Sequence, residues 1–114
     1  LIPELNRLID HEIELAEKGK GGRIILKMNG LQDPSMIDRL YEASQRGVQI
    51  DLIVRGICCL IPGQTYSRNI RVTRIVDTFL EHARVWYFGN GGNPKVYSGS
   101  PDWMRRTYTA ASKP

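Results

Sequence analysis

Residues that mark disulfide or metal chemistry are scarce in this chain of 114 residues, which holds two histidines and two cysteines. The cysteines, Cys58 and Cys59, are adjacent. Neighbouring side chains of an extended strand point to opposite faces, so a disulfide between these two would be strained. The pair is therefore neither a disulfide framework nor a metal-ligand set, and it favours a reducing, cytoplasmic setting.

Long hydrophobic runs are also missing. No stretch approaches the roughly 18 apolar residues of a membrane-spanning helix, and no basic region followed by an apolar run marks a signal peptide. The chain begins at Leu1 and not at Met, which indicates a piece of a longer protein. Its 41% hydrophobic and 25% charged residues fit one soluble globular domain over residues 1–114.

Charge of one sign is in excess. The net charge is +4 and the sequence pI is about 9.3, which favours an anionic partner.

Short apolar segments alternate with amphipathic ones over the first half of the chain. The runs RIILKM (23–28) and QIDLIV (49–54) are rich in branched residues and typical of buried strands. Between them, Asp33 is placed to cap a helix, Pro34 suits its first turn and Gly47 suits its end. A strand–helix–strand unit with short connections predicts a right-handed crossover with parallel strands.

The second half of the chain is less regular. Residues 55–69 are loop-like, and a loop of this length in a compact domain is often functional. Residues 75–83 contain a helical turn. Asp102 is expected to cap another short helical turn at Trp103, and the polar tail from residue 107 is expected to fray.

Together these segments predict an α/β domain with a mostly parallel sheet flanked by helices. The expected helices are 3–18 and 34–46, and the expected strands are 23–28, 49–54, 70–73, 84–88 and 95–99. The Gly- and Asn-rich segment GNGGNP joins the last two strands as a hairpin.

Arg55 follows the strand 49–54 directly. Ligands of open α/β sheets bind outside the carboxyl ends of the strands, and an arginine there can hold a phosphate through a planar two-pronged contact. The structural alternative is an arginine that lies at an interface or caps a loop.

His82 and Arg84 form a second candidate pair. If residues 82–84 are extended, both side chains point to the same face. Histidine can act as nucleophile or proton donor in phosphoryl transfer, and arginine can offset charge on the phosphoryl oxygens. The alternative is a histidine that is structural or merely exposed. The other histidine, His11, lies among charged helix residues and is expected to be solvated.

The segment YSGSPDWM supplies a third candidate group. Ser98, Ser100 and the backbone amides around Gly99 suit phosphate oxygens at the end of a strand. A turn that leads to Asp102 is the plainer reading. Trp86 and Trp103 are expected in the core.

Several of these segments, in this order, resemble the C-terminal catalytic region of bacterial polyphosphate kinase. They are KMNGLQDPSMIDRLYEASQRGVQIDLIVRG, IVRGICCLIPG, FLEHARVWYFGNGG and VYSGSPDWM. The similarity runs from about residue 7 to residue 105, and it ends where RRTYTAASKP departs from the family pattern.

The resemblance implies a fold and an activity. The family moves the γ-phosphoryl group of ATP reversibly to the end of inorganic polyphosphate, with Mg2+. Its chains have four domains, and the two C-terminal ones resemble phospholipase D. The chain would then be the last of these domains. It would pair with the preceding catalytic domain in a cytoplasmic homo-oligomer, with peripheral membrane association open and no nucleic acid as partner.

The resemblance also assigns roles to residues. Arg55 stands at the family's ATP-binding arginine and His82 at its second essential histidine, whereas the phosphorylated histidine belongs to the preceding domain. We expect His82 and Arg84 to be catalytic, and Arg55, His82 and Ser100 to bind ATP or phosphate. No metal ligand is expected in this chain.

Two other function classes stay open at this stage. A phospholipase D-type phosphodiesterase half-domain would carry H-x-K-x4-D, but here Arg84 replaces the lysine and Gly89 stands at the aspartate. A basic nucleic-acid-binding module would suit the net charge, but the basic residues are scattered and the aromatics lie in apolar runs.

Overall fold

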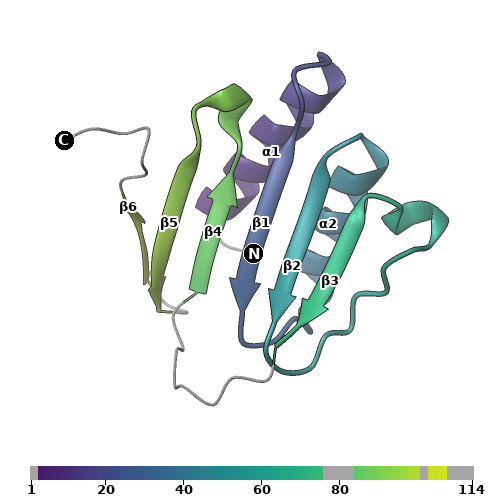
Figure 1. Ribbon diagram of the computed structural model, residues 1–114, viewed down its shortest axis with the longest axis vertical. Coiled ribbons are helices and arrows are strands. Elements are labelled where there is room, and N and C mark those ends of the chain that lie inside the picture. The colour runs from purple at the N-terminus through teal and green to yellow at the C-terminus, as the bar shows by residue number, and fades with distance from the viewer. Residues whose placement is uncertain (1–2, 76–83, 101–102, 108–114) are drawn as a thin grey trace.

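The computed structural model describes residues 3–75, 84–100 and 103–107, which form a six-stranded sheet with two helices on one face (Figure 1). The helices are α1 (Pro3–Glu17) and α2 (Pro34–Gln45), with short 3-10 helices η1 (Thr65–Ser67) and η2 (Asn90–Gly92). The strands are β1 (Arg23–Met28), β2 (Gln49–Val54), β3 (Ile70–Arg74), β4 (Arg84–Phe88), β5 (Lys95–Ser100) and β6 (Trp103–Thr107). The expected α/β class is confirmed.

The sheet is mixed, in the order β3-β2-β1-β4-β5-β6. β1 pairs parallel with β2, and β2 with β3, as the crossover pattern predicts. On the other side of β1 the pairs β1–β4, β4–β5 and β5–β6 are antiparallel. The expectation of a mostly parallel sheet is therefore wrong for the second half of the chain, where β4, β5 and β6 follow one another closely in sequence and pair antiparallel.

The signals that delimit α2 are confirmed. Asp33 is its N-cap, and the Asp33 carboxylate accepts a hydrogen bond from Ser35 N at 2.9 Å. Beyond the helix, Gly47 has φ +100°, a conformation that a side chain would disfavour. The chain can therefore turn directly into β2.

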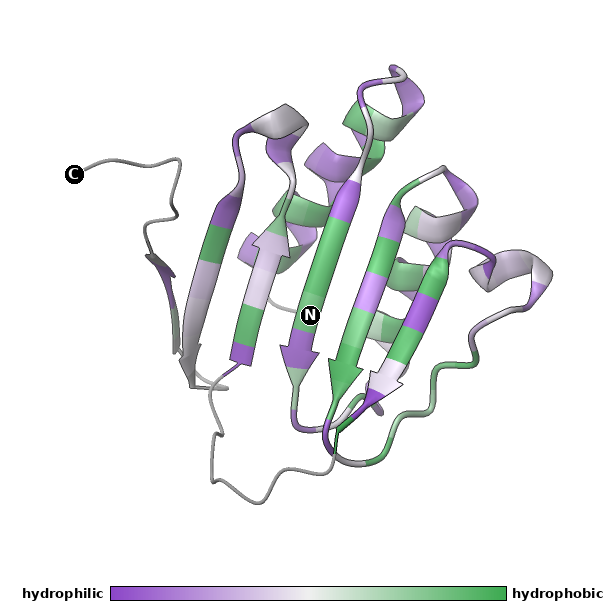
Figure 2. Cartoon of the chain, in the orientation of Figure 1, coloured by the Kyte–Doolittle hydropathy of each residue, from purple (hydrophilic) through white to green (hydrophobic). Residues whose placement is uncertain are grey.

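One face of the sheet packs against both helices to form the core. Alternate residues of β1 and β2 are buried, and so are Trp86 and Phe88 of β4. The helices contribute apolar stripes of buried residues, namely Leu5, Leu8, Ile9 and Ile13 of α1 and Met36, Ile37, Leu40 and Ala43 of α2. Figure 2 shows hydrophobic residues concentrated along the central strands.

Polar contacts join the two helices on their outer sides. Arg39 of α2 forms ion pairs with Asp10 of α1 and with Glu42. Burial disfavours the charged form of Arg39, but the hydrogen bonds and charges of Asp10 and Glu42 outweigh it and raise the pKa of the guanidinium. Arg39 is therefore a fixed positive charge between the helices.

A fully buried carboxylate, Glu12 of α1, joins the helix to the sheet. Its two oxygens accept hydrogen bonds from the backbone amides of Arg23 and Asn90, each at 3.0 Å. These residues begin β1 and η2, so one side chain fixes α1 against both segments.

The strand β6 was not predicted. Instead of a helical turn capped by Asp102, Trp103–Thr107 extends along β5, with Met104 opposite Gly99 and Arg106 opposite Tyr97. WMRRT lacks the apolar–polar alternation of a half-buried strand, so its own pattern did not predict the pairing with β5. Within the described ranges, no helix is long and apolar enough to cross a membrane.

Candidate functional site

The candidate residues gather at one edge of the sheet. β1, β2 and β3 all end there, β4 begins there, and β5 ends beside the start of β4 (Figure 1). We call this edge the carboxyl rim. It is where the topology of an open α/β sheet places a ligand.

Arg55 lies at the centre of the rim, as its position after β2 predicts. Its backbone amide donates to Met28 O at 3.1 Å, which ties the residue to the end of β1. The next residue, Gly56, donates to Asn29 O at 2.7 Å, and a Cβ at Gly56 would lie 2.6 Å from the same oxygen. Only glycine allows this close approach, which fixes the path of the chain around a half-buried Arg55.

Arg84 lies at the same rim, at the first position of β4. Strand alternation places it on the face of Trp86 and Phe88, which is the face that the helices cover. It lines a hollow of about 380 Å³ together with Met28, the 30–33 loop and Met36 of α2.

The Nε atom of Arg84 is buried and has no hydrogen-bond partner among the residues that the structure describes. Leaving a buried donor unsatisfied costs about 1–3 kcal/mol. Asp33 also lines the hollow, although one of its oxygens accepts from Ser35 N as part of the α2 cap. A cation with an unused buried donor beside an open hollow is suited to an acceptor supplied by a ligand.

The Gly-Ser segment joins the site through the register of β5. Gly99 is the Cα partner of Arg84, and Ser98 is the partner of Val85. Ser100 ends β5 at the rim, where its backbone pairs with Trp103. The structure thus brings Arg55, Arg84 and the backbone of residues 98–100 to one edge.

The remaining predicted residue, His82, lies outside the described residues. Sequence reasoning missed the 30–33 loop and Met36, which complete the hollow around Arg84. The only signal was the cap at Asp33, which places the start of α2 near the end of β1. Within 3–75, 84–100 and 103–107, no three His, Cys, Asp or Glu side chains are grouped so as to hold a metal ion.

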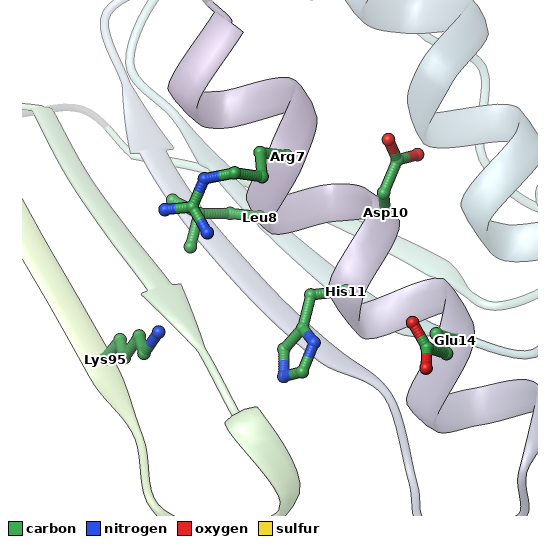
Figure 3. A pocket seen from close by; sticks show the side chains of 6 residues that line it. All are labelled: Arg7, Leu8, Asp10, His11, Glu14 and Lys95. Carbon is green, nitrogen blue, oxygen red and sulfur yellow. The ribbon is translucent and has the colours of Figure 1, made fainter.

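A second hollow, of about 350 Å³, lies between α1 and the start of β5, away from the carboxyl rim (Figure 3). Arg7 and His11 of α1 and Lys95 of β5 line it. Arg7 already forms an ion pair with Glu4, and His11 Nε2 lies 2.8 Å from Asn90 Oδ1. His11 is exposed, as expected, but it is held to the β4–β5 connection, so we assign it a structural role.

Comparison with known proteins places the chain in a family. A sequence model described as polyphosphate kinase C-terminal domain 2 matches residues 1–110. The chain belongs to this family. Relatives include polyphosphate kinase 1 of Chlorobaculum tepidum, 59% identical over 100 residues, and polyphosphate kinase of Prochlorococcus marinus, 54% identical over 103 residues. These matches cover 87% and 90% of this chain.

The fold of this polyphosphate kinase domain agrees with the sequence match. The crystal structure of polyphosphate kinase from Porphyromonas gingivalis superposes with a TM-score of 0.87 and 51% sequence identity over 94% of this chain. The expected phospholipase D-like fold is thereby confirmed. The match covers 19% of that structure, and the chain spans 14% of the length of the curated relatives above.

Proposed function

We propose that this chain is the last catalytic domain of a polyphosphate kinase, which moves the γ-phosphoryl group of ATP reversibly to inorganic polyphosphate. The observation that carries the proposal is the cationic carboxyl rim, where Arg55 follows β2 and Arg84 begins β4 at the same edge of the sheet in a chain of this family. ATP and polyphosphate are both polyanions, which suits a net charge of +4.

Each residue has a role in this proposal. Phosphoryl transfer asks a protein mainly for positioning and for stabilisation of charge. Arg55 anchors a phosphate of ATP with its planar fork, and the guanidinium of Arg84 offsets charge on the phosphoryl oxygens. Ser100 and the amides beside Gly99 contribute hydrogen bonds at the same rim.

His82 binds or protonates a phosphoryl oxygen and is not the nucleophile. It stands two residues before Arg84, which lines the hollow at the rim. The covalent intermediate would form on a histidine of the preceding catalytic domain.

The metal and the assembly follow from the same proposal. Mg2+ would arrive with ATP, and no step in this chain is assigned to the metal. The full-length protein would be a cytoplasmic homo-oligomer. Peripheral membrane association is tested by fractionating cells that express it.

The deciding experiment uses the full-length protein with Mg2+, γ-labelled ATP and polyphosphate. We expect label in polyphosphate and an acid-labile label on the protein, at a histidine other than His82. His82→Ala should cut turnover strongly while leaving the labelled site intact. His82→Gln should recover part of the turnover if hydrogen bonding is its role.

Two outcomes would contradict the proposal. Absence of transfer by the wild-type protein would remove the proposed activity altogether. A label that maps to His82 by mass spectrometry would keep the activity and make His82 the nucleophile.

A further inference from the structure

Three basic side chains converge on the hollow between α1 and the start of β5, which we call the α1–β5 hollow. Arg7 and His11 stand one turn apart on α1 and extend toward the strands, and Lys95 points back toward α1 from β5 (Figure 3). The volume of about 350 Å³ is that of a small-ligand site. The hollow lies away from the carboxyl rim, so the rim residues do not account for it.

The two carboxylates that line the α1–β5 hollow already have cationic partners. Asp10 forms an ion pair with Arg39 and points toward α2 (Figure 3). Glu14 accepts a hydrogen bond from Lys18 at 2.7 Å, and this bond together with the charge of Lys18 lowers the pKa of the Glu14 carboxyl. Both negative charges are therefore offset outside the hollow, and the basic side chains determine its sign.

The register of β5 and β6 places a further cation beside the hollow. Lys95 lies opposite Phe88, and Arg106 lies opposite Tyr97. The rings of Phe88 and Tyr97 are buried on the face of the sheet where the helices lie, so both cations are on that face. They are diagonal neighbours, about 7–8 Å apart. Among the described residues, no carboxylate forms an ion pair with either cation.

Hydrogen bonds fix the two walls of the hollow against each other. Glu12 of α1 accepts from Asn90 N at 3.0 Å, and His11 Nε2 lies 2.8 Å from Asn90 Oδ1. Asn90 Nδ2 in turn donates to Asn93 O at 3.0 Å, two residues before Lys95. His11 thus acts as a positioning residue for the connection that leads to Lys95. Cations held in place before a ligand arrives lower the ordering cost of binding.

We propose that Arg7, Lys95 and Arg106 bind an inner segment of a long polyphosphate chain whose reacting end lies at the carboxyl rim. The inference rests on the proposed function. Strand β5 connects the two places, since it begins at Lys95 and ends at the rim. Its six residues rise about 3.3 Å each, so its ends lie about 17 Å apart. A long chain can contact both places at once, and the second contact raises its apparent affinity.

The lining of the hollow favours a run of phosphates over a nucleotide. Among the described residues that line it, Leu8 alone is apolar and none is aromatic, so nothing there encloses or stacks on a base. Repeated phosphate groups offer an acceptor to each cation in turn. Arg7 pairs with Glu4 in the free chain, but an exposed ion pair of this kind contributes little and is readily exchanged for a ligand.

The first test measures dissociation constants of the full-length protein without ATP, for long-chain polyphosphate and for tripolyphosphate. The variant combines Lys95→Gln with Arg106→Gln. The control combines Lys20→Gln with Arg68→Gln, which removes the same charge at two exposed positions that do not line the hollow.

We expect the Lys95/Arg106 variant to bind long-chain polyphosphate about tenfold more weakly and with a flatter dependence on salt, because two charge contacts are lost. The control should stay within about twofold of the wild type, since it loses only long-range attraction. Tripolyphosphate should bind all three proteins alike, because it is too short to reach from the rim to the hollow.

The second test locates the contact in the wild-type protein and needs no substitution. Lysines are acetylated with acetic anhydride and quantified by peptide mass spectrometry, with and without ligand. Long-chain polyphosphate should suppress most of the acetylation of Lys95 and leave that of Lys20 unchanged. Tripolyphosphate and ATP, at the same concentration of phosphate groups, should leave Lys95 reactive.

Three results would overturn the inference. Equal weakening in the two double variants shows that only net charge matters. Acetylation of Lys95 that long-chain polyphosphate does not suppress shows that the chain does not reach the hollow, and suppression by ATP or tripolyphosphate shows a general anion site. Transfer from ATP is scored separately, so a protein that binds long chains at Lys95 without transferring phosphate contradicts the proposed function and not the contact.

Discussion

At the scale of single residues, Arg55 illustrates why charge alone does not define an anion site. Its backbone is tied to β1 through Met28 O, and Gly56 directly after it approaches Asn29 O closely. The guanidinium therefore starts from a fixed point on the rim. Because the backbone of Arg55 is fixed, its planar guanidinium can be aimed so that it holds two phosphate oxygens at once. The ammonium group of lysine has no such planar fork.

We therefore expect Arg55→Lys to weaken the use of ATP by the full-length enzyme. The change keeps the charge and loses the planar fork. Loss of one hydrogen bond to a charged group is worth about 1.5–3 kcal/mol, or roughly one to two decades in kcat/KM. Steady-state kinetics with ATP varied at saturating polyphosphate measure it. Unchanged kcat/KM would show that Arg55 does not contact ATP.

Glu12 makes a prediction about stability at the same scale. In Glu12→Gln, one carboxylate oxygen becomes an amide NH2 that faces the backbone amide of Arg23 or Asn90. The NH2 group of the glutamine side chain and a backbone N–H are then both donors that face each other in the fully buried site of residue 12. We expect a loss of about 1–3 kcal/mol in the free energy of unfolding.

Chemical denaturation, followed with a probe in this domain, measures the effect of Glu12→Gln. Glu17→Gln is the control, because Glu17 is half-exposed and forms a 3.4 Å surface ion pair with Arg46. That change should stay within about 0.5 kcal/mol. Equal effects of the two substitutions would show that the Glu12 contacts do not stabilise the domain.

At the scale of elements, the loop between β2 and β3 is organised by α2. Ile61 N donates to the Tyr41 hydroxyl at 2.9 Å, and the rings of Tyr41 and Tyr66 meet edge to face at 4.7 Å. Ser67 adds a hydrogen bond from Gln64 N at 2.9 Å. A long loop thus has a defined path beside the carboxyl rim.

Tyr41→Phe should loosen this loop without unfolding the domain. It removes the acceptor of Ile61 N and keeps the ring. A net hydrogen bond is worth about 0.5–1.5 kcal/mol, so amide exchange in peptides covering 57–67 should be about 2- to 10-fold faster in the full-length protein. Tyr66→Phe keeps the ring contact and should leave the exchange nearly unchanged. A similar rate in both variants would assign the loop's order to other contacts.

Elements with local signals were predicted well from the sequence. β1, β2 and β4 have the predicted bounds, and Asp33, Pro34 and Gly47 mark the ends of α2. Pairing between distant segments was not predictable, because the antiparallel contact of β4 with β1 depends on strands far apart in the sequence. β6 was missed for a different reason, since WMRRT lacks an alternating pattern although it pairs with its sequence neighbour β5.

In the candidate site, too, residues with a local sequence signal were predicted and those that depend on contacts between distant segments were not. Arg55 and the Gly-Ser segment could be placed at the rim because each ends a strand with a recognisable pattern. The hollow around Arg84 could not, because it needs Met28, the 30–33 loop and Met36 to meet across the sheet. His82 stays a prediction.

At the scale of the whole molecule, the proposed function assigns to this chain a cationic rim and not a complete reaction centre. The family resemblance puts the phosphorylated histidine in the preceding domain. We therefore expect the purified 114-residue chain to transfer no phosphate from labelled ATP to polyphosphate, after circular dichroism has shown that it is folded. The rest of the polypeptide, added in trans, should restore measurable transfer. Turnover by the chain alone would place the nucleophile within it.

The position of β1 in the middle of the sheet has a consequence for synthesis. One edge of β1 pairs with β2, which follows it closely in sequence. The other edge pairs with β4, which comes much later in the chain and whose residues 85–88 lie opposite residues 24–27. A ribosome therefore releases an apolar strand with one bare edge long before its second neighbour is made. An unpaired strand edge is a template for association with other chains. We therefore expect a risk of aggregation during translation until β4 has been made.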